Sequence, residues 1–560
     1  MKRQRIFRVL AALAGLCTVV AIGLTPKLRA QQPRQAQLVA VQVLGTTSKL
    51  RDFVPSLHEE PNAPFKIFPF RVPPQASNKP GSGGNRGGGG GGTSWTDPVL
   101  QTSTSGIASN YTLAGTSFDG IGENGYVPSD ANLSVGNCAV SDCGGTVPTE
   151  QIVEIANVEY AIYGSSGNVL LPPAPIHTIF NGFTASMCST VDGGDPIALF
   201  DAIDQRWIIS QLAYPSSLND NHLCIAISVN SDAAGSYNLY DLAFGVDFPD
   251  YPKLAVWSDG GSYAGIYLST NIFYGGSIFV GAAGCAIPLS IVTNPPASGS
   301  STAIPCFGPD SAAYNLLPAG LEGASFAPLG TPGLYLQFVN SGGASGSTLN
   351  LYRFQWSGSS GTLLGPTAIS VPEFHEACGG GACVPQYGTR EKLDSLGDRL
   401  MYRLSYLGTY DQMVVNHSVQ ISSSTNQTGV RWYAIQHPGG TPTVSDAGTF
   451  APTTSYGWMG SIAQDKNGDL GLGYSTSSSS AHPGLAVTGR IPSDSVNELE
   501  PETQVFTGAG SQTSINRWGD YTSTSVAPDG CTFWYVNQYI NSSGSWQTRI
   551  ANFKFTSCVP

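Results

Sequence analysis

The sequence has 560 residues, of which 26 are basic and 38 acidic, so its formal net charge is −12 at pH 7. An acidic chain of this kind is a poor partner for nucleic acid or for an anionic membrane surface, and we exclude both. Only 11% of the residues are charged, whereas 68 are glycine and 10% are aromatic. This composition is typical of an extracellular all-β protein with many short strands and turns.

The first thirty residues have the pattern of a secretory signal peptide. Four basic residues precede the apolar run 9–24, and Ala30 ends a small-residue cleavage site. Cleavage there removes six basic residues and no acidic one, which leaves 20 basic against 38 acidic residues. No later apolar segment reaches the roughly 20 residues needed to span a bilayer. We therefore expect a secreted monomer, extracellular or at the cell surface, without a membrane span.

Residues 31–92 differ in composition from the rest of the chain. Proline punctuates 31–70, and 71–92 reads RVPPQASNKPGSGGNRGGGGGG. Such low-complexity sequence predicts a disordered linker over 31–92, followed by one folded domain over 93–560.

One local pattern recurs through the predicted domain. In GDPIALFDAIDQRWIISQ (194–211), an apolar run stops at an aspartate-rich turn and a second run returns. This is a β-hairpin signature, in which the aspartates bond their own backbone. The same form occurs at 158–171, 349–364, 461–475 and 523–537.

The spacing of these strand pairs, about 50 to 60 residues, predicts a β-propeller. No stretch of helical length with a 3.6-residue period interrupts them. We expect seven blades, with six as the alternative. Their expected centres lie near residues 160, 205, 265, 350, 415, 470 and 535.

Ten cysteines remain after removal of the signal peptide, an even number that suits an oxidising compartment. There is no CxxC motif, so a zinc–thiolate site is disfavoured. Spacing suggests sequential disulfides, although sequence alone leaves the connectivity open. The expected pairs are Cys138–Cys143, Cys188–Cys224, Cys285–Cys306, Cys378–Cys383 and Cys531–Cys558.

Charged residues at the starts of predicted inner strands are the candidate ligand site. Inner strands line the channel of a propeller, so charges at their starts converge on one face and can grip a carboxylate or a sugar. The alternative is that Arg–Asp pairs tie neighbouring blades together. The candidate catalytic carboxylates are Asp250, Asp398 and Asp520, and the candidate ligand-binding residues are Lys253, Arg399, His417, Arg490, Arg517 and Trp518.

Two stretches alternate oxygen-bearing side chains within a turn, as calcium loops do. They are Asp130 with Asn132, and Asp465 with Asn467 and Asp469. Neither has the terminal glutamate of a calcium loop, and an ordinary Asx turn is the favoured interpretation of both. We expect no cofactor, with calcium as the one candidate ion.

Arg490-Ile491-Pro492 and the turn APDGCTF (527–533) resemble two features of sialidases, the arginine motif that binds the substrate carboxylate and the Asp-box. In sialidases the arginine motif precedes the Asp-boxes, whereas here it lies near the end of the chain. The turn also lacks the residue between Asp and Gly. The resemblance implies the propeller fold class, and we interpret the tripeptide as a chance match.

Longer motifs extend over about residues 95–558: PSDANLSVG (128–136), GDPI (194–197), DYPKL (250–254), DRLMYR (398–403), WMGS (458–461), TGR (488–490) and RWGDY (517–521). By these motifs the chain resembles a family of large, secreted, mostly uncharacterised bacterial proteins. The resemblance implies a propeller-like domain and no assigned reaction.

The sequence therefore predicts a secreted β-propeller that binds an extracellular glycan or another protein. It has no nucleophile elbow, HExxH motif or phosphate loop, and we expect no enzyme activity. The alternative is a propeller glycoside hydrolase that uses carboxylates of the channel. A structural envelope protein is a third interpretation.

Overall fold

Strands make up most of the regular structure. The computed structural model describes residues 34–35, 37–53, 66–67, 94–145, 149–339, 345–358, 360–513 and 515–559. These belong to one compact unit, Pro33–Pro560, whereas a second unit, Met1–Gln32, lies outside the described residues together with the predicted signal peptide. Among the residues described, no helix is both long and apolar enough to cross a membrane.

The strands form successive four-stranded antiparallel groups in which neighbours in sequence pair. The first group is β7 (Asn132–Cys138), β8 (Thr149–Ala156), β9 (Glu159–Gly164) and β10 (Val169–Pro175). The second is β11 (Ile197–Asp201), β12 (Arg206–Ala213), β13 (Asn221–Ser228) and β14 (Tyr237–Gly245). The third is β15 (Asp247–Trp257), β16 (Gly265–Tyr274), β17 (Ile278–Pro288) and β18 (Ser301–Asp310).

The later groups repeat this plan. The fourth is β19 (Leu317–Leu321), β20 (Gly333–Val339), β21 (Ser345–Ser357) and β22 (Ser360–Glu376). The fifth is β25 (Met401–Leu407), β26 (Gln412–Gln420), β27 (Thr428–Gln436) and β28 (Thr443–Phe450). The sixth is β29 (Tyr456–Gln464), β30 (Leu470–Ser478), β31 (Ala481–Arg490) and β32 (Thr503–Thr507). The last is β33 (Ser523–Val526), β34 (Thr532–Ile540), β35 (Trp546–Phe555) and β5 (Tyr111–Gly122).

The remaining elements are short. The minor strands are β1 (Arg34–Gln35) on β22, β4 (Leu100–Gln101) on β28, β3 (Lys66–Ile67) paired with β6 (Tyr126–Val127), and β23 (Ala382–Val384) paired with β24 (Leu393–Asp394). The helical turns are α2 (Val140–Cys143), α3 (Leu289–Thr293), η1 (Leu50–Asp52), η2 (Ile176–Phe180), η3 (Met187–Ser189), η4 (Ala377–Gly380) and η5 (Gly408–Tyr410).

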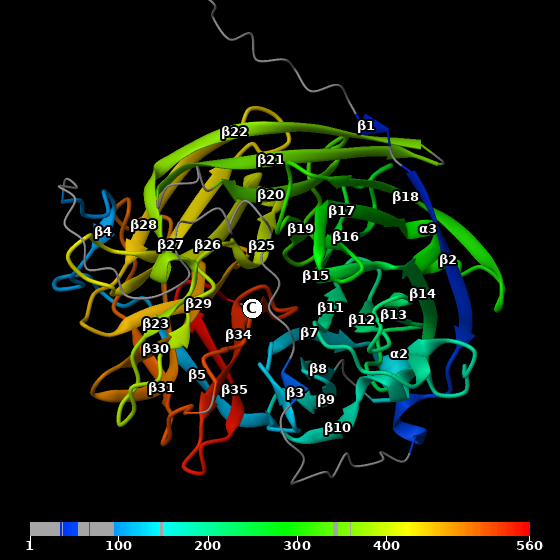
Figure 1. The fold of residues 1–560 in the computed structure, drawn as a ribbon, viewed down its shortest axis with the longest axis horizontal. Coiled ribbons are helices and arrows are strands. Elements are labelled where there is room, and N and C mark those ends of the chain that lie inside the picture. Colours follow the sequence, from blue (N-terminus) through cyan, green and yellow to red (C-terminus); the bar gives the residue numbers. More distant parts are fainter. Residues whose placement is uncertain are drawn as a thin grey trace, which may run out of the picture. The chain divides into compact units, whose positions relative to one another are not determined.

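The first strands of successive groups contact one another in a closed series: β7, β11, β15, β19, β25, β29, β33 and again β7. Such a closed series of inner strands is the arrangement of a β-propeller. The last group contains strands from both ends of the ring, because β5, which precedes the first group in sequence, pairs with the C-terminal strand β35 (Figure 1). Residues far apart in sequence therefore close the ring.

The inner strands, and strands further out such as β13, are apolar on both faces because every group packs against a neighbour on each side. Ile197, Ala198 and Leu199 of β11 are all buried, as are Leu223 to Ile227 of β13. This explains why the sequence shows continuous apolar runs in place of strict alternation. The predicted hairpin at Asp201 is confirmed: its Oδ1 accepts hydrogen bonds from the N–H groups of Ile203 and Asp204, at 2.9 and 3.1 Å.

The prediction of a disordered linker over 31–92 requires a correction. β2 (Gln37–Thr46) lies between β14 and β18 and joins the outer edges of the second and third groups. Val41, Val43 and Leu50 of this segment are buried. The run QLVAVQV can pair as a strand despite the proline and glycine around it, whereas the glycine-rich half, 71–92, lies outside the described residues.

The five predicted disulfides are present: Cys138–Cys143, Cys188–Cys224, Cys285–Cys306, Cys378–Cys383 and Cys531–Cys558. Cys285–Cys306 joins the paired strands β17 and β18, and Cys531–Cys558 ties the β33–β34 turn to the C-terminal residues. These bridges are consistent with an oxidising extracellular compartment.

Candidate functional site

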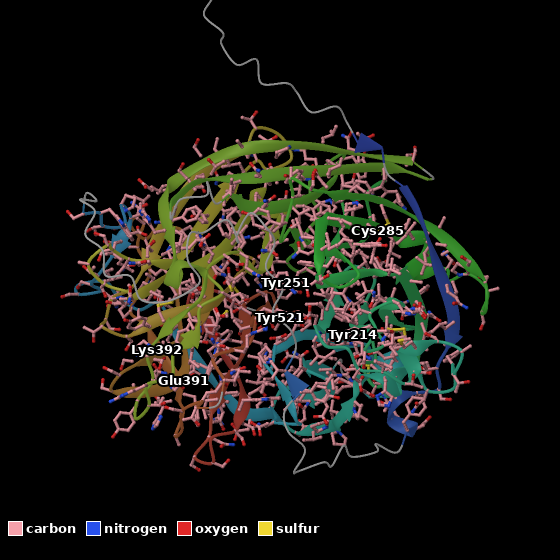
Figure 2. All side chains as sticks on the ribbon, in the orientation of Figure 1. Tyr214, Tyr251, Cys285, Glu391, Lys392 and Tyr521 are labelled. Carbon is pink, nitrogen blue, oxygen red and sulfur yellow. A yellow bond between two sulfur atoms is a disulfide. The ribbon has the colours of Figure 1, made fainter. Side chains whose placement is uncertain are left out.

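Charged side chains from the starts of several first strands gather into one buried ionic cluster. Asp130 precedes β7, Asp195 precedes β11, Lys253 lies in β15 and Asp520 precedes β33. The rings of Tyr251 and Tyr521 flank this cluster, with their centroids 6.2 Å apart. Figure 2 labels both residues near the middle of the view.

The aspartates of the cluster connect neighbouring groups through hydrogen bonds. Asp130 Oδ1 accepts from the N–H of Asp520 at 2.6 Å, and its Oδ2 accepts from Asn157 Nδ2 at 2.8 Å. Asp195 Oδ2 accepts from the N–H of Tyr251 at 3.0 Å. The first group is thereby joined to the last, and the second to the third.

The backbone at these positions has an unusual conformation. Asp130, Asp195, Tyr251 and Asn315 have φ between 47° and 56°, the left-handed region in which aspartate and asparagine occur more often than most residues. For Tyr251 this conformation is strained, and the surrounding hydrogen bonds must hold it. Asp130, Asp195 and Asn315 each lie two residues before a first strand, whereas Tyr251 lies at the register shift within β15.

Lys253 is fully buried between two aromatic rings. Its Nζ lies 3.5 Å from the centroid of Tyr251 and 4.0 Å from that of Tyr521, and donates to the carbonyl oxygen of Pro252 at 3.0 Å. Burial lowers the pKa of Lys253 to about 8, against the opposing effect of Asp195. Burial also raises the pKa of Asp130 well above its usual value, reinforced by Asp520 and Asp195.

The two predicted arginine–aspartate pairs are both formed inside the protein. Arg399 Nε and Nη2 donate to the two oxygens of Asp398 at 2.8 and 3.1 Å. Arg517 Nη2 donates to both oxygens of Asp520 at 2.7 and 2.8 Å. Asp398 is 2% exposed and Asp520 is 7% exposed. Each pair joins residues of one short segment, so neither ion pair itself ties two neighbouring blades together.

The structure does not bring three of the predicted ligand-binding residues to this cluster. Arg490 ends β31 and pairs with Asp446 of β28. His417 is buried in β26, with Nε2 3.0 Å from Tyr433 Oη, and burial lowers its pKa well below the usual value. Trp518 is fully buried and donates its indole N–H to Ser475 Oγ at 3.1 Å.

Asp250 directly precedes Tyr251, whose ring flanks the cluster. It belongs to β15, where it pairs in register with Asn271, and its carbonyl oxygen accepts from Thr270 Oγ1 at 2.9 Å. Asp250 is 9% exposed.

The two predicted calcium stretches differ in the structure. In the first, Asp130 uses both oxygens as described above, and Asn132 Oδ1 accepts from the N–H of Ala198 at 2.8 Å. In the second, Asp465 Oδ1 accepts from the N–H groups of Asn467 and Asp469 at 2.9 and 3.0 Å, as an Asx turn does. The first stretch is therefore not an Asx turn, because Asp130 and Asn132 bond to distant parts of the chain. The second stretch contains an Asx turn, which uses Oδ1 of Asp465.

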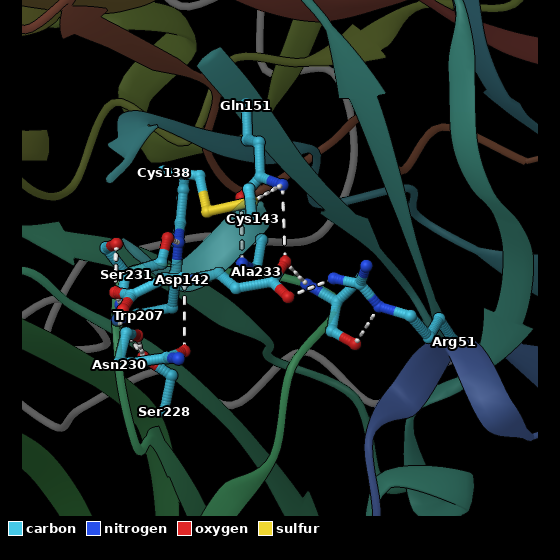
Figure 3. Close-up of polar contacts among 12 residues, drawn as sticks. Arg51, Cys138, Asp142, Cys143, Gln151, Trp207, Ser228, Asn230, Ser231 and Ala233 are labelled. Atoms are coloured by element: carbon cyan, nitrogen blue, oxygen red, sulfur yellow. Dashed lines mark hydrogen bonds and ion pairs between the residues drawn. A yellow bond between two sulfur atoms is a disulfide. The ribbon is translucent and has the colours of Figure 1, made fainter. Parts of the chain in front are cut away.

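One group of possible metal ligands occurs among the described residues, Cys138, Cys143 and Asp232. Its cysteines form a disulfide, so their sulfurs are not thiolate ligands. Figure 3 shows the polar network around the disulfide, with Gln151 and Arg51 labelled. Gln151 Nε2 donates to Asp232 Oδ1 at 3.3 Å, and the Arg51 guanidinium pairs with the same carboxylate. Arg51 thus attaches the segment that follows β2 to the second group.

The channel enclosed by the first strands holds a cavity of about 50 Å³. Glu322 and Arg403 line it and form an ion pair at 3.1 Å. Burial raises the pKa of Glu322, and Arg403 opposes this effect. A cavity of this size holds one or a few water molecules and no sugar.

A larger groove of about 260 Å³ lies between the fifth and sixth groups, close to the lower end of the usual range for small-molecule sites. Its polar lining comes from several turns and strand ends: Tyr410, Gln412, Gln436, Asp446, Arg490 and Asp494. The Arg490–Asp446 pair forms part of its lining, and Arg490 Nη2 also donates to the carbonyl oxygen of Asp494 at 3.0 Å.

Tyr410 stands in a fixed position at the edge of the groove. Its side chain is 42% exposed, and its hydroxyl donates to the carbonyl oxygen of Asn467 at 2.7 Å. A Cβ on Gly468, whose φ is +81°, would lie 3.2 Å from the ring. The aromatic ring is therefore held against the β29–β30 turn of the sixth group while part of it faces solvent.

Sequence reasoning missed this groove because its residues come from separate strands of two groups. The one local signal is a tyrosine in the polar turn GTYDQ (408–412) between two apolar strands. An aromatic residue at such a position is exposed unless another part of the chain covers it.

No protein-family model matches the sequence, and no curated protein matches it in a sequence search. A solved structure of a protein of unknown function from Dyadobacter fermentans is similar over 80% of this chain and 99% of its own, with 10% identity and a TM-score of 0.35. A Penicillium chrysogenum α-L-arabinanase in complex with arabinobiose is similar over 84% of this chain and 100% of its own, with 9% identity and a TM-score of 0.33. A Trypanosoma rangeli sialidase is similar over 76% and 59%, with 12% identity and a TM-score of 0.29. TM-scores of this size do not establish a shared fold, so the propeller assignment rests on the strand pairing.

Proposed function

We propose that the protein is a secreted, seven-bladed β-propeller that binds a neutral extracellular carbohydrate in the groove between its fifth and sixth groups. The blade number is supported by the closed series of first strands from β7 to β33. Each expected blade centre also falls inside one four-stranded group. Secretion is supported by the five disulfides.

The observation that carries the binding proposal is the combination of a fixed aromatic ring with planar polar side chains in one concave site. The exposed part of Tyr410 offers a surface to the C–H face of a sugar. Gln412, Gln436 and Asp446 supply the donors and acceptors that hydroxyl groups require. Because the Tyr410 hydroxyl is already bonded to Asn467, little side-chain freedom is lost on binding.

The charges in the groove favour a neutral ligand over an anionic one. Arg490 is neutralised by Asp446 and is 6% exposed, and Asp494 adds a negative charge. An incoming carboxylate would meet this acidic lining without a free cationic partner. A sialic acid is therefore a poor ligand for this groove.

Binding without hydrolysis is supported by the state of the candidate carboxylates. Asp398 and Asp520 are buried and bonded to arginines, as described above. In the groove, Asp446 Oδ1 accepts from the N–H groups of Ala447 and Asn497, both at 2.8 Å. Asp494 Oδ2 accepts from the N–H of Ile491 at 2.9 Å. The oxygens of these carboxylates are therefore already engaged by donors within the protein.

A neutral-oligosaccharide array, followed by titration of each positive ligand, tests the proposal. We expect Tyr410→Ala to weaken binding about tenfold, the effect of losing one aromatic contact. Tyr387→Ala is the matched control, because Tyr387 is 52% exposed and packs edge-on against His482 at 5.0 Å. Equal binding by Tyr410→Ala and the original protein would show that the groove is not the site.

A further inference from the structure

We propose that the turn joining β29 to β30 binds a calcium ion between the carboxylates of Asp465 and Asp469. This site is separate from the carbohydrate proposal, and none of its tests requires a sugar. It adjoins the groove through Tyr410, whose hydroxyl bonds to Asn467 in the same turn, and through Gly468, which lines the groove.

The first observation is an unsatisfied oxygen. Asp465 is fully buried, with 0% of its surface exposed. Its Oδ1 accepts the two backbone N–H groups of the Asx turn, whereas its Oδ2 is sealed from solvent and receives no N–H donor from the described chain, so its polar neighbour is the carboxyl group of Asp469. A buried carboxylate oxygen without a donor is costly, and either a bound cation or a proton shared with Asp469 removes the cost.

The second observation is that another buried carboxylate, that of Asp469, lies next to Asp465. Asp469 is 2% exposed and interacts with Asp465, so two acidic groups share one small space. Neither forms an ion pair with a basic side chain anywhere in the described part of the chain. Lys466, the cationic residue of the turn, donates from Nζ to the carbonyl oxygen of Asp529 at 3.1 Å. Two adjacent buried carboxylates without a cation repel each other.

The donors available at the site favour calcium. They are carboxylate oxygens with the hydroxyl of Ser557, which lies 3.4 Å from Asp469 Oδ2. Ser557 is exposed, so water can complete the coordination from that side. Calcium accepts six to eight oxygen ligands in flexible geometry, whereas magnesium demands a near-ideal octahedron.

The C-terminal residues are held against the turn. The disulfide Cys531–Cys558 ties the residue after Ser557 to the β33–β34 turn. In the β33–β34 turn, the carbonyl oxygen of Gly530 accepts a hydrogen bond from the N–H of Lys466 at 2.9 Å. The proposed ligands are therefore positioned before the ion arrives, which reduces the entropic cost of binding.

The β33–β34 turn supplies a natural comparison. Asp529 Oδ1 accepts from the N–H groups of Cys531 and Thr532, two and three residues ahead, at 2.8 and 2.9 Å, whereas Asp465 Oδ1 accepts from residues two and four ahead. The Oδ2 of Asp529 accepts from Thr532 Oγ1 at 2.7 Å and is therefore satisfied. The two aspartate turns thus differ in span and in the second carboxylate oxygen, which we assign to the ion in Asp465.

Terbium luminescence and thermal unfolding of the secreted chain, after treatment with EGTA, test the proposal. We expect Tyr410 to sensitise bound terbium and calcium to displace it, with a dissociation constant in the range of about 10⁻⁴–10⁻³ M that extracellular modules show. We expect 10 mM calcium to raise the unfolding temperature by roughly 1–3 °C. Asp469→Asn abolishes both effects, whereas Asp529→Asn keeps them.

An unfolding temperature of the original protein that is the same in EGTA and in 10 mM calcium, together with the absence of displaceable terbium, would overturn the proposal. The two carboxylates would then share a proton in place of an ion. Persistence of the calcium effect in Asp469→Asn would place the ion elsewhere. The measurement on the original protein decides the question even if a variant fails to fold.

Discussion

Glu154 of β8 lies where the first group packs against the last group and the ring of blades closes. Its side chain is fully buried and accepts three hydrogen bonds. Thr548 Oγ1 of β35 donates to Oε1 at 2.6 Å, and the N–H of Ile121 of β5 donates to Oε2 at 2.9 Å. Tyr163 Oη donates to Oε2 at 3.2 Å. One carboxyl group therefore joins the first group to both chain segments that form the last.

Burial raises the pKa of Glu154 to about 7 from 4.5, although its hydrogen bonds oppose the shift. The folded state therefore binds a proton between pH 4.5 and 7 that the unfolded state has lost. The resulting stabilisation is fully present below the unfolded pKa and disappears as the pH rises through the folded pKa. A shift of about 2.5 units corresponds to about 3 kcal/mol, of which about 2.5 kcal/mol is lost between pH 5 and pH 8.

Glu154→Gln removes this dependence while keeping the shape of the side chain. Its amide oxygen can face Ile121 and Tyr163, and its NH₂ group can donate to Thr548 Oγ1, which then acts as acceptor. We expect the free energy of unfolding, measured with urea, to fall by about 2.5 kcal/mol more in the original protein than in the variant from pH 5 to pH 8. Parallel pH profiles for the two proteins would show that Glu154 does not cause this pH dependence.

Two further predictions concern the ionic cluster and the C-terminal disulfide. Asp520→Asn leaves the buried guanidinium of Arg517 without its carboxylate. We therefore expect the free energy of unfolding, measured with urea, to fall by about 3–5 kcal/mol while the carbohydrate affinity stays unchanged. Weakened affinity in a folded variant would give the cluster a role in binding. Replacing Cys531 and Cys558 by serine opens a loop of 27 residues, and we expect a loss of about 3 kcal/mol, measured in the same way. An unchanged unfolding midpoint would show that other contacts already hold the C-terminal residues.

The sequence is informative wherever the signal is local. The hairpin at Asp201 depends on a turn whose aspartate bonds residues two and three positions ahead, so a short window contains the whole interaction. Arg399 pairs with Asp398 for the same reason. β2 was missed because its stability comes from strands about 200 and 260 residues away, which a composition of proline and glycine around it does not reveal.

The sequence predicts that charged residues converge on one site, but it identifies only some of the residues that form it. Residues at the starts of first strands do converge, which places Lys253, Arg517 and Asp520 in one cluster. Arg490 looked equivalent by charge, yet it ends a third strand and therefore faces the groove. Whether a charged residue is open to solvent depends on long-range packing, which a single sequence does not contain.

The proposed carbohydrate site is tested most directly by titrating the secreted protein and its Tyr410→Ala variant with a neutral oligosaccharide, with free reducing ends measured in the same samples. We expect saturable binding by the original protein, about tenfold weaker binding by the variant, and no release of reducing ends in either. Release of reducing ends would make the protein a glycoside hydrolase, and equal affinity of the two proteins would exclude the groove as the carbohydrate site.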